Sequence, residues 1–145
     1  MKQLFSVLCL AAILASTAAY SEQSQQVGPF EVHYIAFPTT FLSPEVAQQY
    51  DIVRGKDRAL VNLSILDAQG SAVTATVTGT MKNLPGQILP LKFVEVREGD
   101  ALYYLASARY TDQEIVRFKI EFSPTDDSPS QAYKLEFQQK LYWEQ

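Results

Sequence analysis

The chain contains one histidine, His33, and an imidazole is the side chain best suited to acid–base or metal chemistry near neutral pH. A metal site needs several ligands, and the sequence offers no second histidine and no His-x-His spacing. A hydrolase with His33 as its base also needs a nucleophile and an orienting group, and no residue can be named for either role. We therefore predict a structural histidine, no catalytic residue, no metal site and no cofactor.

A second group of chemically active residues is basic. Arg54, Lys56 and Arg58 form the one dense basic cluster of an acidic chain, in a loop that follows a predicted helix. Because loops often hold binding groups, this cluster is a candidate receptor for a carboxylate, a phosphate or an anionic envelope polymer. Exposed basic side chains more often only solvate a surface and pair loosely with carboxylates such as those of Asp51 and Asp57. Both interpretations stay open at this point.

A row of hydroxyl groups forms a third pattern. Four alternating threonines project from one face of one predicted strand, at Thr74, Thr76, Thr78 and Thr80. Threonine is a good strand former on a solvated face, so this row needs no function to explain it. No Gly-rich phosphate loop, Gly-x-Ser-x-Gly elbow or comparable catalytic signature is present.

Residues 1–19 have the features of a secretory signal peptide. Lys2 gives a basic start, an apolar run covers residues 4–14, and small residues follow at 15–19. The apolar run is shorter than the roughly 20 residues of a membrane-spanning helix, so we predict no stable membrane anchor. Cleavage after Ala18 or Ala19 fits the pattern, and we favour Ala19.

Removal of this segment changes the chemistry of the remaining chain. Cys9 is the only cysteine, so the mature chain would have no disulfide, thiolate nucleophile or cysteine-bound zinc. The segment carries one of the twelve basic residues and none of the sixteen acidic ones, which leaves a net charge of −5. An acidic chain without a basic footprint argues against nucleic-acid binding.

Seven short runs alternate between apolar and polar residues and are predicted to be strands. They cover residues 30–37, 59–66, 71–82, 88–96, 102–110, 116–122 and 133–143. Residues 20–28 are polar and are predicted to form a flexible lead, with order beginning near Pro29. The turn at 67–70 predicts that the second and third strands are antiparallel neighbours. Pro90 predicts that the fourth strand is an edge or is broken.

One helix interrupts the strands at residues 43–50. Ser43 caps it, Pro44 occupies its first turn, and Glu45 lies near its positive end. The expected fold over residues 29–145 is all-β: a seven-stranded antiparallel sandwich, immunoglobulin-like, with one short helix between the first two strands. A closed barrel is the alternative.

Two segments carry a resemblance to a known family. The sequence VHYIAFPTTFLSPEVA at 32–47, followed by YDIVRGKDRALVN at 50–62, resembles the family catalogued as domain of unknown function 4426. Its members are exported envelope proteins of Gram-negative bacteria, so the resemblance implies a periplasmic location. It implies no activity, cofactor or partner.

Three functions are compatible with these observations. The first is a non-catalytic periplasmic module that binds another envelope protein or peptide through residues 39–58, which the sandwich does not need for closure. The second is a small-ligand or glycan-binding domain that uses His33, Tyr34 and the basic loop. The third is a hydrolase with His33 as base. The second requires His33, Tyr34, Arg54, Lys56 and Arg58 to line one concavity.

Overall fold

Alternation of buried and exposed side chains organises the long strands. In β8 (Glu114–Pro124) the even-numbered residues are buried and the odd-numbered ones face solvent, and β2 (Phe30–Pro38) follows the same rule with half-buried residues between. Successive side chains of a strand point to opposite faces, so each strand contributes one row to a core and one to a surface. The strands predicted at residues 30–37 and 116–122 are confirmed.

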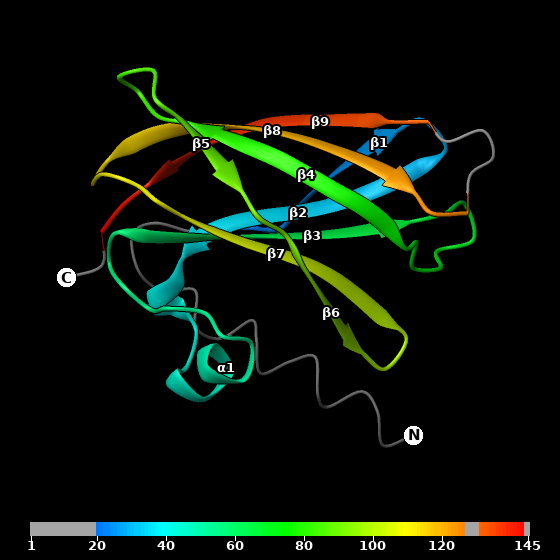
Figure 1. The fold of residues 1–145 in the computed structure, drawn as a ribbon, viewed down its shortest axis with the longest axis horizontal. Helices are drawn as coiled ribbons and strands as arrows, with labels where there is room; N and C mark the ends of the chain where they lie inside the picture. Colours follow the sequence, from blue (N-terminus) through cyan, green and yellow to red (C-terminus); the bar gives the residue numbers. More distant parts are fainter. Residues whose placement is uncertain (1–19, 127–130, 144–145) are drawn as a thin grey trace.

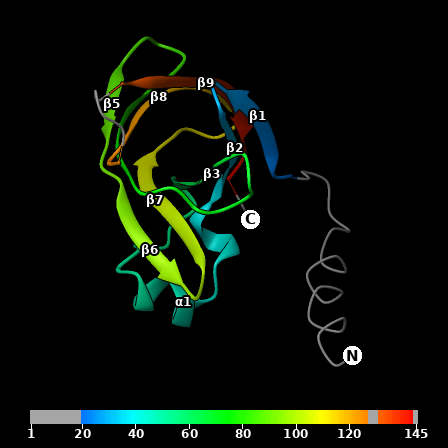
Figure 2. The same ribbon diagram turned by 90° about the vertical axis from the view of Figure 1, so that its right-hand side faces the viewer.

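The computed structural model describes residues 20–126 and 131–143, which form two antiparallel sheets packed face to face (Figures 1 and 2). The five-stranded sheet has the order β1 (Gln23–Val27), β2, β3 (Arg58–Leu66), β7 (Ala101–Arg109) and β6 (Val94–Glu98). The four-stranded sheet has the order β5 (Ile88–Leu91), β4 (Ala75–Lys82), β8 and β9 (Tyr133–Leu141).

Aromatic rings join the inner faces of the two sheets. Phe30 of the five-stranded sheet lies edge-on to Tyr133 of the other sheet, with ring centroids 5.1 Å apart. Tyr34 lies 4.4 Å from Phe137 between centroids. Phe118 and other β8 residues fill the layer between them, at 1% exposure. Burial of each such side chain contributes about 1.5–3 kcal/mol, which makes this layer the main source of stability.

The structure contains nine strands among the described residues, so the prediction of seven is wrong. One added strand, β1, lies inside the segment 20–28 that was expected to be a flexible lead, and it pairs with β2 from Gln23 to Val27. Order also begins before Pro29, because Tyr20 is buried and its hydroxyl accepts a hydrogen bond from the Tyr142 N–H at 3.0 Å. Backbone hydrogen bonds hold β1 against β2. Because its glutamines show no apolar alternation, the sequence contains no signal of a strand there.

The other added strand comes from the run 88–96. It divides into β5, which pairs with β4, and β6, which pairs with β7 in the opposite sheet. Pro90 lies in an edge strand as predicted, but the break falls at residues 92–93, where Phe93 packs against the core. A chain that crosses from one sheet to the other in two residues keeps its alternation and so looks like one strand in the sequence.

The predicted pairing of the strands around 67–70 is also wrong. Asp67 accepts hydrogen bonds at 2.9 Å from the N–H groups of Gln69 and Ser71, and Gly70 has a φ of 80°, so the tight turn itself is present. Beyond one isolated bridge between Leu66 and Ala72, the chain leaves β3 and enters the other sheet as β4. This strand order gives no support to the immunoglobulin-like comparison.

The segment between β2 and β3 projects from one end of the sandwich (Figures 1 and 2). It contains a 3₁₀ turn, η1 (Thr39–Phe41), and the predicted helix, α1 (Pro44–Gln49), whose cap Ser43 accepts from the Val46 N–H at 3.2 Å. No helix in the described ranges is long and apolar enough to cross a bilayer. The predicted signal peptide and its cleavage point lie outside the described residues.

One buried hydrogen bond ties the two sheets together where β4 begins. The hydroxyl of Tyr104 on β7 accepts from the backbone N–H of Ala75 on β4 at 2.8 Å. Burial raises the pKa of the Tyr104 hydroxyl, and the Ala75 N–H opposes that shift. The phenol therefore stays protonated at physiological pH and satisfies a buried backbone donor.

Tyr104→Phe should destabilise the fold by about 1–3 kcal/mol, because the buried Ala75 N–H would lose its acceptor. Tyr103→Phe removes the adjacent hydroxyl on the outer face and should change stability by less than about 0.5 kcal/mol. Urea denaturation of both variants measures the difference. Equal midpoints for the two variants would show that the inter-sheet bond contributes nothing.

Candidate functional site

His33 lies on the outer face of the five-stranded sheet between two carboxylates. Its Nδ1 is 2.9 Å from Oε1 of Glu22, and its Nε2 is 2.8 Å from Oε1 of Glu31. Both nitrogens can donate at once only in the imidazolium form, in which the three side chains make a partly exposed charge cluster. The carboxylates occupy opposite sides of the ring and do not converge on a common point. For His33 to act as a base or to bind a metal, one of the two carboxylates would first have to move away from the ring.

The space beside His33 is small. A hollow of about 20 Å³ is lined by His33, Asn62, Ser64 and Tyr103 among others. Such a volume holds about one water molecule. Oδ1 of Asn62 is buried without a hydrogen-bond partner, and a water in the hollow would satisfy it. This region therefore has no room for a sugar or a peptide side chain.

Tyr34 belongs to the core and not to the same surface as His33. It is 8% exposed, its ring packs on Phe137, and its hydroxyl donates to Oε1 of Gln23 at 3.2 Å. Adjacent residues of a strand point to opposite faces, so the two neighbours cannot meet at one ligand. The concavity required by the glycan hypothesis is not formed by this pair.

Arg54 braces the segment that contains η1 and α1. Its Nε donates to the Leu42 carbonyl at 2.8 Å and its Nη2 to the Thr40 carbonyl at 3.2 Å. Beneath it, the hydroxyl of buried Thr39 donates to the Gly55 carbonyl at 3.1 Å and accepts from the Gly55 N–H at 3.0 Å. The guanidinium thus closes residues 39–55 into a loop, and its hydrogen bonds are directed at the chain itself.

Two further anchors fix this segment to the strands. The hydroxyl of Tyr50 donates to the carboxylate of Glu98 at the end of β6, and this contact raises the pKa of Tyr50. The Lys56 ammonium lies 4.9 Å from the centroid of the Trp143 ring, a cation–π distance. Lys56 is therefore directed toward Trp143, which follows β9.

Arg58 begins β3 and lies directly opposite Arg109 of β7. Like charges at opposed positions of a sheet are unfavourable, and no ion pair within residues 20–126 and 131–143 includes either arginine. The three basic residues therefore have different surroundings. Arg54 bonds to backbone carbonyls, Lys56 contacts the Trp143 ring, and Arg58 lies opposite another arginine. Among the described residues, Arg58 is the one of the three whose side chain makes no hydrogen bond, ion pair or ring contact.

Exposed apolar side chains gather on the same segment. Seven large hydrophobic residues are exposed in the described chain, and three of them lie between residues 39 and 57: Phe41 at 47%, Val46 at 39% and Val53 at 59%. Val94 of neighbouring β6 adds a fourth, at 58%, beside a hollow of about 80 Å³ between this segment and the strands. We call residues 39–57 the apical segment.

Sequence reasoning did not identify three participants in these contacts. Glu31 shares a face with His33 at a spacing of two residues, so strand parity alone could have placed it beside the ring. Glu22 lies in the supposed lead, and Arg109 reaches Arg58 only through the pairing of β3 with β7. Neither pairing leaves a signal in a single sequence.

Comparison with protein families gives a match over most of the chain. The profile of the family described as "Domain of unknown function (DUF4426)" matches residues 24–144. A search of curated protein sequences gives no match.

Solved structures share the fold. The crystal structure of a DUF4426 family protein from Pseudomonas aeruginosa PAO1 is similar, with 32% sequence identity, a TM-score of 0.75, and coverage of 86% of this chain and 97% of that chain. FetP of uropathogenic Escherichia coli strain F11, expressed in the periplasm of E. coli, has 11% identity and a TM-score of 0.63, with coverage of 88% and 97%. A copper-bound FetP variant has 12% identity, a TM-score of 0.61, and coverage of 83% and 95%.

Arg54→Ala should loosen the apical segment and leave the sheets intact. Loss of two hydrogen bonds at an exposed position should cost about 1 kcal/mol locally, which corresponds to roughly fivefold faster amide exchange over residues 40–54. Hydrogen–deuterium exchange with mass spectrometry measures this, and Arg97→Ala, which removes an exposed arginine of β6 outside the segment, serves as the matched loss of charge. Unchanged exchange in Arg54→Ala, or the same acceleration in the control, would contradict the bracing role.

Proposed function

This chain belongs to the DUF4426 family, and from that premise we propose that it is a non-catalytic periplasmic module that binds another envelope protein or peptide through its apical segment. The observation that carries this proposal is the combination of three exposed apolar side chains with a braced backbone in a segment that the two sheets do not need.

Preorganisation is the physical advantage of this segment. An ordered loop loses less conformational entropy on binding than a flexible one, so more of the contact energy appears as affinity. The bonds from Arg54 and Thr39 fix the backbone before a partner arrives. The exposed faces of Phe41, Val46 and Val53 then offer apolar area of the kind found at the centre of protein interfaces.

The arginine pair gives the surface a preference for an acidic partner. Arg58 and Arg109 oppose each other at the base of the apical segment, where a partner carboxylate would relieve their repulsion and bind as a charge-assisted pair. The proposed partner therefore presents apolar side chains beside an acidic residue. An exported chain meets such partners in the periplasm, which the signal-like segment 1–19 and the periplasmic expression of FetP support.

The copper named for the FetP variant is not proposed for this chain. Copper in proteins favours imidazole, thiolate and thioether ligands. This sequence has one histidine, and Met81 is fully buried in the core. Within residues 20–126 and 131–143 no group of three or more histidine, cysteine, aspartate or glutamate side chains is placed to hold a metal. The side chains of the described residues therefore do not fit a copper ion.

For the hydrolase hypothesis, the structure provides a carboxylate that could orient His33, but it places no serine where His33 could activate it. Glu22 orients the ring through Nδ1, and Ser24 and Ser64 are the cross-strand neighbours of His33. Nε2, which would have to activate a serine, faces Glu31 instead, and the hollow admits about one water. We keep the binding module as the proposed function.

Site-specific photocrosslinking tests the proposal. A photoreactive phenylalanine analogue at position 53 of the mature protein should give a discrete adduct in periplasmic extract. Excess unlabelled wild-type protein should abolish the adduct, whereas excess Val46→Asp protein should compete at least about tenfold less well, because a charge would enter the apolar contact.

Position 84 provides the control. Leu84 is 75% exposed in the turn between β4 and β5. This turn lies far from α1 in both ribbon views (Figures 1 and 2). Position 84 should give no competable adduct. The same adducts from both positions, or none from position 53 in any extract fraction, would remove the apical segment from the account.

A further inference from the structure

The outer face of the four-stranded sheet differs in charge from the rest of the molecule. The outward rows of β4, β8 and β9 carry five of the twelve basic residues of the chain and two of the sixteen acidic ones. The basic residues are Lys82, Arg117, Lys119, Lys134 and Lys140, and the acidic ones are Glu121 and Glu136. This face therefore has a surplus of three positive charges in a chain whose net charge is −4.

The positive charges are only partly neutralised within the sheet. Lys134 pairs with Glu121 at 3.9 Å, but none of the ion pairs among the described residues includes Lys82, Arg117 or Lys119. Lys82 lies directly opposite Arg117 in the pairing of β4 with β8. Opposed like charges cost stability, and local costs of this kind are typical of functional surfaces.

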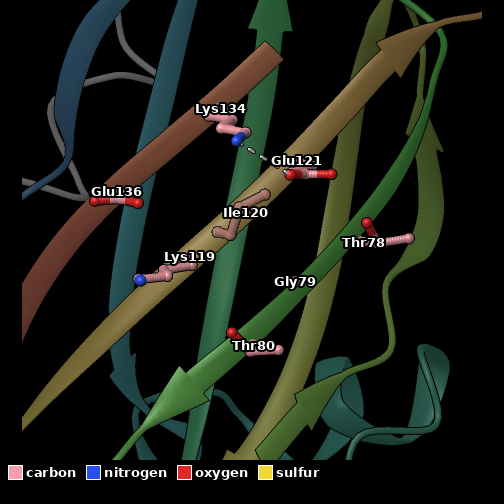
Figure 3. A pocket seen from close by; sticks show the side chains of 8 residues that line it. All are labelled: Thr78, Gly79, Thr80, Lys119, Ile120, Glu121, Lys134 and Glu136. Atoms are coloured by element: carbon pink, nitrogen blue, oxygen red, sulfur yellow. Dashed lines mark ion pairs between the residues drawn. The ribbon is translucent and has the colours of Figure 1, made fainter. Parts of the chain in front are cut away.

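Two adjoining hollows follow β8 across this face. One, of about 430 Å³, is lined by threonine hydroxyls from β4 and by charged side chains from β8 and β9 (Figure 3). The second, of about 490 Å³, continues past Arg117 and Gln138 and shares Lys119 and Glu136 with the first. We call the two together the β8 trough. Both are open, and in Figure 3 the charged side chains stand along β8 and β9 with Thr78 and Thr80 on β4.

The chemistry of the β8 trough selects among anionic ligands. Lysine and arginine supply donors for carboxylates, while Thr78, Thr80 and Glu136 supply acceptors for hydroxyl groups. Of the apolar residues that line the trough, Phe118 and Ile120 are 1% exposed and Phe137 is half-buried, so they offer little area to a peptide or an acyl chain. The two glutamates repel the negative charge of any anionic ligand, and a ligand that also carries hydroxyl groups can offset this repulsion by donating hydrogen bonds to them.

We propose that the β8 trough binds an acidic polysaccharide, with Arg117 and Lys119 receiving its carboxylates and Glu136 accepting from its hydroxyl groups. The trough lies on the sheet opposite the one that carries the apical segment, so this proposal stands independently of the proposed protein partner. A long acidic polymer also matches an open trough, because several weak contacts along one chain add through effective concentration.

Calorimetric titration of the mature protein with polygalacturonate tests the proposal. Wild type should bind, and Arg117→Gln with Lys119→Gln should weaken binding about tenfold, since two charge-assisted contacts are lost. Lys92→Gln with Arg97→Gln removes the same charge elsewhere on exposed residues and should bind as wild type does. Dextran, a neutral polymer, should not bind.

Glu136→Gln separates specific recognition from simple charge attraction. The exchange makes the face more positive, so simple attraction predicts tighter binding, whereas replacement of a charged acceptor by the weaker amide oxygen predicts about threefold weaker binding to polygalacturonate. Tighter binding by Glu136→Gln, equal binding of poly-glutamate by wild type, or no binding of polygalacturonate would each overturn the proposal. Poly-glutamate binding would indicate an acidic protein partner instead.

Discussion

Each of the two sheets has one apolar face, and exposure of that face to water is unfavourable. The remaining structure depends on the burial of these two faces against each other. Phe30 and Tyr34 reach across to Tyr133 and Phe137, and the inward residues of β8 fill the space between them. The inner rows are committed to packing, so any function that this protein has must lie on outer faces, edges or connections.

The connections show how that constraint leaves room for function. The chain could join β2 to β3 with a short turn, because the two strands are antiparallel neighbours. It instead forms the apical segment, in which Arg54 and Thr39 satisfy backbone groups while Phe41, Val46 and Val53 remain outside. The outer face of the opposite sheet is mostly polar and cationic. One domain thus presents two surfaces of different chemistry.

Alternation in the sequence was sufficient to predict the all-β class and the strands at 30–37 and 116–122. The capping residues predicted the helix after Ser43, and Pro90 predicted that its strand is an edge or is broken. Alternation could not predict β1, whose glutamines and serine show no apolar period, or the crossing at Phe93, which interrupts pairing without interrupting alternation. The predicted site residues do not form one site, because strand geometry and strand order, and not nearness in the sequence, decide which side chains meet. His33 and Tyr34 are adjacent in sequence and opposite in space, whereas Arg58 meets Arg109 only through strand order.

The central claim is that the apical segment is already ordered in the free protein and needs no partner to fold. Hydrogen exchange of the Gly55 and Ile52 amides in the isolated mature protein tests this most directly, because their N–H groups bond to Thr39 Oγ1 and to the Ala47 carbonyl. The account predicts exchange slowed by about a hundredfold or more relative to an unstructured peptide. Exchange of both amides at unstructured rates, with the sheets protected, would show that the segment orders only on binding and would contradict the account.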